Sequence, residues 1–394
     1  MKLVNAMLAG LLAATLVGCH GSAGPTGVLE VTPIQSLVDE PVHVRVTGLN
    51  PGQRIALSAS MPELEGARWA SRATFTAGAD GVVDLDRDAP DAGDYSGVDG
   101  MGLIASMAVQ GPATTTGASA ETDGGFVLRI SLSGGASIDL RRVVLASAVT
   151  THELTIAADR VSGLLALPAH PTGPGVLLIG GSEGGLSKSM TWVAEVLAAH
   201  GYPALAIAYF HAPGLPGELQ NIPIEYFATA ARLLPGPVRV VGYSRGSEAA
   251  MLLSGLYPDL VAGAVLVSPA ASVHVGFPNG GNAWTYHGAA QTQIPFDAIA
   301  GPVLAFVGTD DQIWPSGSYV QTLQYRLGQR LDTLEVDGAG HEMLGVPYLS
   351  FDPAVTQPLT GEQLDLGGTR LGDEQARRQT WAALLHFLAT PPAH

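Results

Sequence analysis

The sequence predicts a β-sandwich over residues 28–156, followed by an α/β domain with a mostly parallel sheet over residues 157–394. In the first part, short segments alternate apolar and polar residues, which is typical of half-buried strands. In the second part, continuous apolar runs alternate with segments of helical character, which indicates a parallel sheet covered on both faces. The chain has 394 residues, of which 46% are hydrophobic, so it can build two or three domains.

The composition limits the partners that the protein can bind. Its net charge is −16, and the only lysines are Lys2 and Lys188. Without a basic surface to neutralise phosphates, we expect no nucleic-acid partner. No group of histidines, cysteines and carboxylates has metal-ligand spacing, and no glycine-rich phosphate loop stands out, so we expect neither a metal nor a cofactor. The composition does not indicate an oligomeric state.

The N-terminus has the pattern of an export signal. Lys2 supplies a positive charge, and residues 6–17 are apolar but too few to span a membrane, so residues 1–18 predict a signal peptide. The stretch "LVGC" resembles a bacterial lipobox, which implies that Cys19, the only cysteine, is lipidated and anchors the protein in the cell envelope. Residues 19–27 then form a short tether. The alternative is an ordinary signal peptide that ends near a cysteine.

The strands of the first domain follow from period-two patterns. "PVHVRVTGL" places Val42, Val44 and Val46 on one face. The same theme repeats in "RIALSAS", "ATFTA", "FVLRISL" and "RRVVLAS", with turn sequences such as "NPGQ" and "GADG" between the strands. Strands at this spacing favour an immunoglobulin-like β-sandwich. We expect the glycine-rich residues 95–103 to form a loop.

The elements of the second domain alternate in order. Strands are predicted at "GVLLIG", "PALAIAYF", "VRVVGY", "VAGAVLVS", "GPVLAFVG" and "DTLEVDG". Helices are predicted at "KSMTWVAEVLAAHG", "PIEYFATAARLL", "SEAAMLLSGLY" and "EQARRQTWAALLHFLA". The second of these helices starts at Pro223, where proline is tolerated.

Two serines share the Gly-x-Ser-x-Gly pattern. Ser244 in "GYSRG" lies between a predicted strand and a helix that follows without a gap, which is the context of a nucleophile elbow in the α/β-hydrolase fold. Ser182 in "GGSEG" is separated from the next helix by a loose loop. We therefore interpret Ser244 as the nucleophile. The expected oxyanion donors are the N–H of Arg245 and the N–H of Ser182 or of a residue next to it.

The other members of a catalytic triad occur in the order that this fold requires. "GTDDQIWP" follows a strand, and its spacing from Gly308 and Pro315 selects Asp311 over Asp310 as the acid. The alternative is that both aspartates are turn residues. His341 in "GAGHEM" lies just beyond the next strand, where it can take a proton from Ser244 while Asp311 orients its ring. A purely structural histidine is the alternative.

In combination, these segments resemble one enzyme family over nearly the whole chain. "DEPVHVRVTGLNPGQ", "DYSGVDGMGLI", "GYSRGSE", "GTDDQIWPS" and "GAGHEMLGVPY" are similar in order and spacing to the acyl-CoA thioesterases and bile acid-CoA:amino acid N-acyltransferases. The resemblance implies a triad at Ser244, Asp311 and His341. Amidating members usually carry cysteine at the position of Ser244, whereas hydrolysing members carry serine, so the resemblance implies hydrolysis of thioesters or esters.

Other residues and functions remain open. Phe277, Trp284 and Tyr286 are candidate residues of an acyl pocket, with plain packing as the equal alternative. For Arg245 and Glu248 we favour a structural ion pair over substrate binding. Two alternatives to a hydrolase stay in view. One is an acyltransferase that passes the acyl group to an amine or alcohol, and the other is a non-catalytic binding lipoprotein on a hydrolase scaffold.

Overall fold

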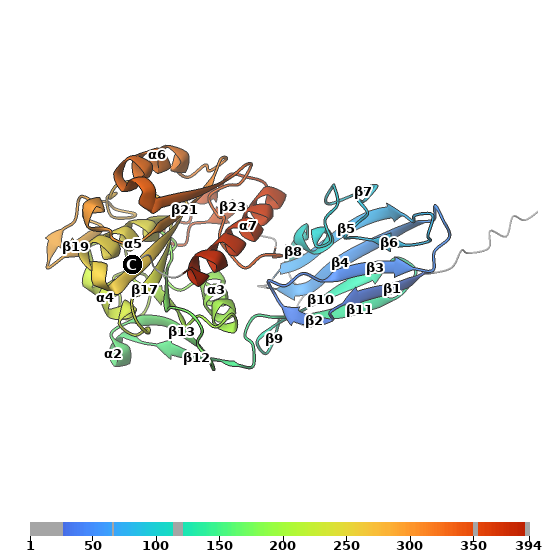
Figure 1. Ribbon diagram of the computed structural model, residues 1–394, viewed down its shortest axis with the longest axis horizontal. Helices are drawn as coiled ribbons and strands as arrows, with labels where there is room; N and C mark the ends of the chain where they lie inside the picture. The colour runs from blue at the N-terminus through green and yellow to red at the C-terminus, as the bar shows by residue number, and fades with distance from the viewer. Residues whose placement is uncertain (1–26, 65–66, 113–120, 350–353, 391–394) are drawn as a thin grey trace, which may run out of the picture.

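The computed structural model describes residues 27–64, 67–112, 121–349 and 354–390 and arranges them as two domains along the long axis of the molecule (Figure 1). The predicted signal peptide, Cys19 and the tether up to residue 26 lie outside the described residues. Among the described residues, no helix is both long and apolar enough to span a membrane.

The N-terminal domain is a β-sandwich, as predicted. One sheet has the order β1 (Val28–Thr32), β3 (His43–Thr47) and β6 (Val83–Asp84). The second sheet follows the path β2 (Gln35–Leu37), β11 (Ser137–Val143), β10 (Gly125–Leu132), β4 (Arg54–Leu64), β5 (Ala67–Thr76) and β7 (Ala92–Gly93), with β8 (Ala108–Pro112) beside β5 and β9 (Glu121–Thr122) beside β10. Buried and exposed residues alternate along β3 and β10, so each strand gives one face to the core.

The predicted loop over residues 95–103 ends in a short helix. Helix α1 (Gly102–Ala105) is fully buried. Its Leu103 carbonyl accepts a hydrogen bond from the Ser71 hydroxyl of β5, which fixes this segment against the sandwich. The end of the loop is therefore part of the core and not a free connection.

The C-terminal domain contains one large sheet. Its order is β12 (Val149–Leu154), β13 (Ser162–Pro168), β15 (Ala204–Ala208), β14 (Val176–Ile179), β17 (Val238–Tyr243), β18 (Val261–Val267), β21 (Val303–Gly308) and β22 (Leu331–Val336). The strands from β15 to β22 pair in parallel, whereas β12 and β13 extend the sheet antiparallel at one edge. This is the mostly parallel sheet of an α/β-hydrolase.

The boundary between the domains lies earlier than the sequence predicts. The sequence predicts a sandwich up to residue 156, but β12 pairs with β13 in the large sheet, with Thr151 opposite Ala166. Buried and exposed residues alternate only weakly along β12, as an edge strand allows. Its sequence therefore did not separate it from the sandwich strands before it.

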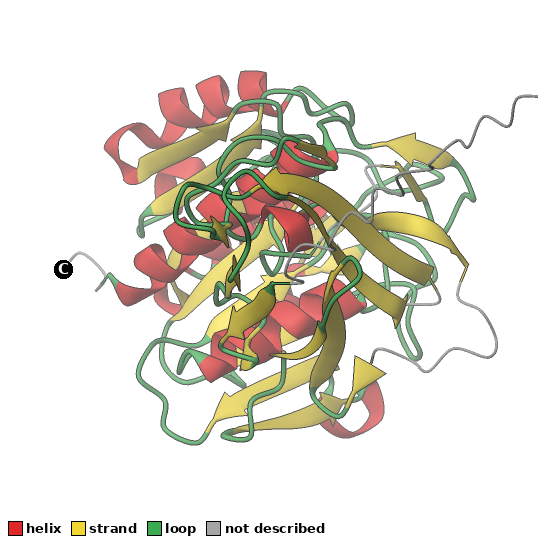
Figure 2. Ribbon diagram, turned by 90° about the vertical axis from the view of Figure 1, so that its right-hand side faces the viewer, coloured by secondary structure: helices red, strands yellow, loops and turns green. Residues whose placement is uncertain are grey.

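Helices cover both faces of the large sheet. Alternate residues of β14 point to opposite sides, so Leu178 joins one core while Leu177 and Ile179 join the other. The first core includes α3 (Lys188–Ala199) and α7 (Arg370–Ala389), and the second includes α4 (Ile224–Ala231), α5 (Arg245–Leu256) and α6 (Ser316–Leu327). Figure 2, in which the sandwich end faces the viewer, shows strands crossing in front of the helices.

Smaller elements complete the domain. These are α2 (Ile156–Asp159), the short 3-10 helices Pro258–Leu260, Phe296–Ala298 and Gly328–Arg330, a three-stranded sheet of β16 (Ile222–Pro223), β19 (Trp284–Tyr286) and β20 (Ala289–Ala290), and a hairpin of β23 (Ala354–Thr356) and β24 (Gln363–Asp365). Helix α6 was not predicted, and α7 begins at Arg370 instead of residue 374 because the Thr369 side chain caps it by accepting from the Gly372 N–H.

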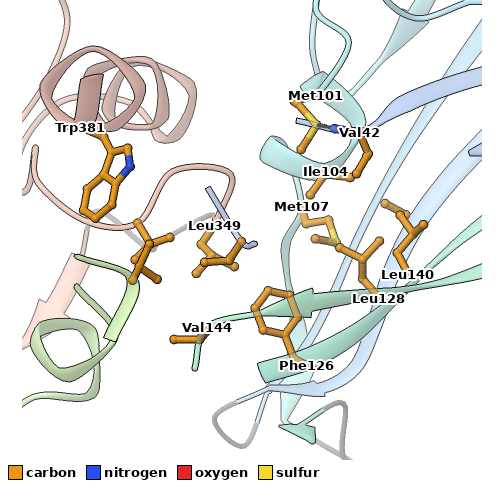
Figure 3. Packing of buried hydrophobic residues seen from close by; sticks show 14 of the residues in the cluster. Val42, Met101, Ile104, Met107, Phe126, Leu128, Leu140, Val144, Leu349 and Trp381 are labelled. Atoms are coloured by element: carbon orange, nitrogen blue, oxygen red, sulfur yellow. Dashed lines mark hydrogen bonds between the residues drawn. The ribbon is translucent and has the colours of Figure 1, made fainter. Parts of the chain in front are cut away.

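One apolar core continues from the sandwich into the second domain. Figure 3 shows Phe126, Met107 and Val144 of the sandwich side facing Leu349 and Trp381. The ring of Phe126 also stacks on Trp192 of α3, with centroids 5.8 Å apart. Contacts of this kind join the domains through buried apolar surface, which favours a fixed arrangement over independent motion.

Candidate active site

Ser244 occupies a sharp turn between β17 and α5. Its φ of 51° and ψ of −117° are unusual for a residue with a side chain. The flanking glycines make the turn possible: a Cβ on Gly242 would lie 2.3 Å from the Gly246 carbonyl oxygen. A Cβ on Gly246 would lie 2.3 Å from the Ile179 carbonyl oxygen. The Gly-x-Ser-x-Gly pattern is therefore a requirement of backbone packing at this elbow.

His341 connects the serine to an acid. Its Nε2 lies 2.9 Å from Ser244 Oγ, and its Nδ1 lies 2.9 Å from Asp311 Oδ2. The His341 side chain is 4% exposed. Its backbone is held on both sides, because its N–H donates to the Leu366 carbonyl and its own carbonyl accepts from the Tyr243 hydroxyl. The structure thus brings together the three residues that the sequence selects as a triad.

Asp311 is held as a carboxylate. Its Oδ2 also accepts from the Ser316 hydroxyl at 2.6 Å, and its Oδ1 accepts from the N–H groups of Ile313 and Trp314. Burial opposes ionisation, but the hydrogen bonds from His341, Ser316 and the backbone outweigh it, so the pKa of Asp311 lies below its ordinary value. Asp310 is exposed, and its carboxylate accepts from the Gln312 side chain.

The expected oxyanion donors come from the residue after Ser244 and from the loop after β14. Arg245 is the first residue of α5, where the N–H groups of the first turn have no partner within the helix. Ser182 follows β14, and the peptides around it are fixed: the Tyr209 hydroxyl donates to the Gly181 carbonyl at 2.8 Å. The Gln357 side chain donates to the Ser182 carbonyl at 2.7 Å. These bonds set the direction of the N–H groups in this loop.

A cavity of about 220 Å³ opens beside Ser244 and His341. Its apolar lining includes Leu178, Met190, Val193, Val241, Leu344, Val355, Leu364 and Leu366. Its polar lining includes Ser182, Glu183, Ser187, Ser189, Glu342 and Gln357. An apolar cavity with a few polar groups beside a reactive side chain is the usual form of a small-molecule site.

The aromatic residues predicted to form an acyl pocket do not line this cavity. Trp284 is fully buried on the other side of the large sheet, where its ring packs near Tyr209 and Phe227. Tyr286 contacts Tyr257 edge-on, and Phe277 pairs through its backbone with Leu219. The prediction that Phe277, Trp284 and Tyr286 form the pocket is therefore wrong, and plain packing explains these side chains.

The pair of Arg245 and Glu248 is structural, as favoured. Arg245 Nε lies 3.1 Å from Glu248 Oε1, and the Glu248 side chain is fully buried. The same carboxylate accepts from His274 and from the Trp284 indole N–H. This network fastens the segment after β18 onto α5 and directs the Arg245 side chain away from the cavity.

Several residues of the site were missed by the sequence analysis. Glu183 lies within "GGSEG" and Glu342 directly follows His341, but neither position carries a pattern that predicts a place in the cavity. The hairpin of β23 and β24 also escaped prediction because each strand has three residues, too few to show a period. Among the described residues, no group of three or more histidines, cysteines or carboxylates could hold a metal.

Comparisons with known proteins cover both domains. Residues 39–156 match the model of the acyl-CoA thioester hydrolase/BAAT N-terminal region, and residues 282–391 match the BAAT/acyl-CoA thioester hydrolase C-terminal model. The acyl-coenzyme A amino acid N-acyltransferase 1 of Mus musculus is 27% identical over 91% of this chain and 96% of its own. The bile acid-CoA:amino acid N-acyltransferase of Homo sapiens is 28% identical with the same coverage. The peroxisomal succinyl-coenzyme A thioesterase of Mus musculus is 26% identical over 95% and 96%.

Proposed function

We propose that this chain, which belongs to the family of acyl-CoA thioesterases and bile acid-CoA:amino acid N-acyltransferases, is a serine hydrolase that cleaves acyl thioesters or carboxylic esters. The observation that carries the proposal is the pair of 2.9 Å contacts that join Ser244 Oγ, the two nitrogens of His341 and Asp311 Oδ2. This geometry suits a serine activated by a general base whose ring is oriented by a carboxylate.

The first half of the reaction acylates Ser244. His341 Nε2 takes the hydroxyl proton as Oγ attacks the thioester or ester carbonyl carbon, and Asp311 stabilises the imidazolium that forms. The negative charge on the carbonyl oxygen is met by the N–H of Arg245 and by an N–H near Ser182. Collapse breaks the bond to the thiol or alcohol, which leaves with the proton from His341.

The second half releases the acyl group. Water enters in place of the leaving group, gives a proton to His341, and attacks the acyl carbon through the same oxyanion site. The second tetrahedral species expels Ser244 Oγ, which takes the proton back, and the free carboxylic acid departs. The proton transfers use Ser244, His341 and Asp311, which already contact one another.

Acyl transfer is the second candidate. The matched N-acyltransferases of mouse and human favour it, because an amine that replaced water in the second half would yield an amide. The oxygen nucleophile of this chain favours hydrolysis, since the resemblance associates transfer to amines with a cysteine at this position. The fraction of the acyl-enzyme that reacts with water, compared with the fraction that reacts with an added amine, distinguishes hydrolysis from acyl transfer.

The test measures both products. The full chain is incubated with acyl-CoA thioesters and p-nitrophenyl esters of several chain lengths, with and without glycine or taurine as acceptor. We expect free carboxylic acid as the main product and a fall in kcat of about 10⁴-fold or more in Ser244→Ala. A wild-type protein that yields chiefly the amide would assign it to the acyltransferases, and equal turnover by Ser244→Ala would contradict the mechanism.

We also propose that the protein is anchored in a bacterial cell envelope through a lipid on Cys19. The support is the signal-like N-terminus and the lipobox-like "LVGC". Metabolic labelling with a clickable palmitate analogue is expected to tag the wild type and not Cys19→Ala. Equal incorporation in both proteins, or none in either, would contradict the anchor without bearing on catalysis.

A further inference from the structure

The cavity beside Ser244 contains two carboxyl groups that the catalytic mechanism does not use. We propose that this cavity selects uncharged acyl groups and rejects acyl groups that end in a carboxylate, with Glu183 and Glu342 as the residues that make the selection. The inference rests on the proposed hydrolysis of thioesters or esters, because it concerns the acyl group that Ser244 accepts.

Glu183 lies close to the reacting serine. Its Oε1 accepts from the Gly181 N–H at 3.0 Å. A Cβ added to Gly181 would lie 2.8 Å from Glu183 Oε2 and 3.1 Å from Ser244 Cβ, so the carboxyl and the serine face the same side of Gly181. Burial raises the pKa of Glu183, and the charge of the nearby Glu342 raises it further. The hydrogen bond from the Gly181 N–H lowers the pKa but does not cancel the effect of burial.

Glu342 lines the same cavity from the segment that carries His341. Burial raises the pKa of Glu342, whereas the positive charge of Arg377 lowers it. Arg377 is 1% exposed on α7, lies 3.4 Å from Glu374, and does not line the cavity. The positive charge of Arg377 therefore acts on Glu342 from inside the protein. The Arg377 side chain offers no hydrogen-bond donor to an acyl chain in the cavity, because it does not line the cavity.

Other cations near the site are also engaged elsewhere. Arg245 is paired with Glu248, and its guanidinium donates to the carbonyls of His274 and Val275. Lys188 lies over the ring of Trp192. Among the described residues that line the cavity, none is a lysine or an arginine. A carboxylate that entered this space would therefore meet two acidic side chains and no lysine or arginine, and the basic group among these lining residues is the His341 ring that the reaction itself uses.

Solvation makes this arrangement selective. An uncharged acyl chain gains free energy when it leaves water for the apolar wall that includes Leu178, Val193 and Leu364. A terminal carboxylate would lose its hydration there without an ion pair. It would also be repelled by Glu183 and Glu342 whenever these are ionised, which their raised pKa values shift to higher pH. A terminal cation would lose hydration as well, but it would be attracted by the same carboxyl groups. A comparison of an acyl group that ends in a carboxylate with one that ends in a cation therefore distinguishes two explanations. If the cavity rejects any polar group, both are poor substrates to the same degree, whereas electrostatic selection disfavours the carboxylate more.

The test compares three thioesters of similar length. Heptanoyl, adipyl and 5-(trimethylammonio)pentanoyl groups are presented as N-acetylcysteamine thioesters, so that the leaving group carries no charge. With the full-length wild type, we expect kcat/KM to be about 100-fold lower for adipyl than for heptanoyl, with the trimethylammonio substrate between them. The readout is the adipyl-to-heptanoyl ratio within each protein, which does not depend on the amount of folded enzyme.

Substitutions locate the effect. At the alkaline end of the enzyme's working range, where carboxyl groups of raised pKa are most fully ionised, Glu183→Gln and Glu342→Gln are each expected to raise the adipyl-to-heptanoyl ratio about tenfold, because each removes one negative charge at nearly constant volume. Glu335→Gln is the matched control, since it removes a charge from an exposed position on β22 and is expected to leave the ratio unchanged.

The possible outcomes distinguish a failure of this inference from a failure of the proposed function. Equal kcat/KM for adipyl and heptanoyl in the wild type would overturn the inference and leave the proposed hydrolysis intact. Slower turnover of the trimethylammonio substrate than of adipyl, or an unchanged ratio in both glutamine variants, would also overturn it. Failure of the wild type to hydrolyse even the heptanoyl thioester and the matching p-nitrophenyl ester would count against the proposed function itself.

Discussion

At the residue scale, the glycines around Ser244 have a steric role that the motif alone does not reveal. Gly242 and Gly246 pack against carbonyl oxygens of the elbow and of β14, so neither site has room for a methyl group. The elbow therefore holds the serine in its strained conformation by close backbone packing on two sides.

Gly246→Ala tests this packing. The new Cβ would lie 2.3 Å from the Ile179 carbonyl and 2.4 Å from the Gly180 carbonyl, so backbone must move. We expect a loss of about 1–3 kcal/mol in the free energy of unfolding, measured by urea denaturation. Gly217→Ala is the control, because a Cβ there meets nothing within 4 Å. A Gly246→Ala protein as stable as this control would contradict the steric explanation.

The choice between the adjacent aspartates is a second prediction at this scale. Asp311→Asn replaces the charged carboxylate that orients His341 by a neutral amide with one oxygen and one NH2 group, and we expect kcat to fall by about 10⁴-fold with the fold retained. Asp310→Asn alters an exposed carboxylate that contacts Gln312 and is expected to retain kcat within a fewfold. Steady-state kinetics on a p-nitrophenyl ester checks both, and the reverse ranking would assign the acid to Asp310.

At the element scale, the active site depends on segments that come from distant parts of the sequence. The hairpin of β23 and β24 supplies Val355, Gln357 and Leu364 to the cavity wall. It is joined to the loop after β14 by the hydrogen bond from Gln357 to the Ser182 carbonyl. The hairpin thereby completes the cavity and restrains the loop that is expected to hold the oxyanion.

Substitutions at Gln357 test this restraint. Its Oε1 accepts from the N–H groups of Leu359 and Thr360 within the hairpin, whereas its Nε2 donates to Ser182. Gln357→Glu keeps the acceptor but puts a carboxylate oxygen against the Ser182 carbonyl in place of the donor, so we expect kcat/KM to fall about tenfold and, because Gln357 is buried, the melting temperature to fall as well. Gln357→Ala loses both and is expected to lower both quantities. Wild-type kcat/KM in Gln357→Glu would contradict the restraint.

The sequence was informative where physical constraints are local. Continuous apolar runs predicted β14, β17, β18 and β21, and the glycine pattern with the order of Asp311 and His341 selected the triad now found within hydrogen-bonding distance. Prediction from the sequence failed for features that depend on contacts between residues far apart in the chain. The sheet to which β12 belongs, the role of Trp284 in the core and the position of Glu183 in the cavity all depend on partners remote in sequence.

At the scale of the whole molecule, a buried carboxylate joins the two domains. Asp39 Oδ2 of the sandwich lies 2.6 Å from His200 Nε2 and accepts from the Trp381 indole N–H at 2.9 Å. Arg378 of α7 donates to Asp99 of the sandwich as well. Polar bonds of this kind fix the register of the apolar junction shown in Figure 3.

The junction makes stability depend on pH. The hydrogen bond to Asp39 raises the pKa of His200 above its ordinary value of 6.5, against the opposing effect of burial. A raised pKa in the folded state means that this stabilisation is complete below about pH 6.5 and is lost as pH rises through the folded pKa. We expect the difference in unfolding free energy between wild type and His200→Gln to shrink from pH 5.5 to pH 8.5. A difference that is constant or grows would contradict this assignment.

The central claim is that Ser244 is the residue that attacks the acyl carbon, and a fluorophosphonate probe tests it most directly. The probe bonds covalently to an activated serine oxygen, and tryptic peptide mapping locates it. We predict labelling on Ser244 in the wild type, equal labelling in Ser182→Ala and none in Ser244→Ala. Labelling that persists in Ser244→Ala and disappears in Ser182→Ala would contradict the account.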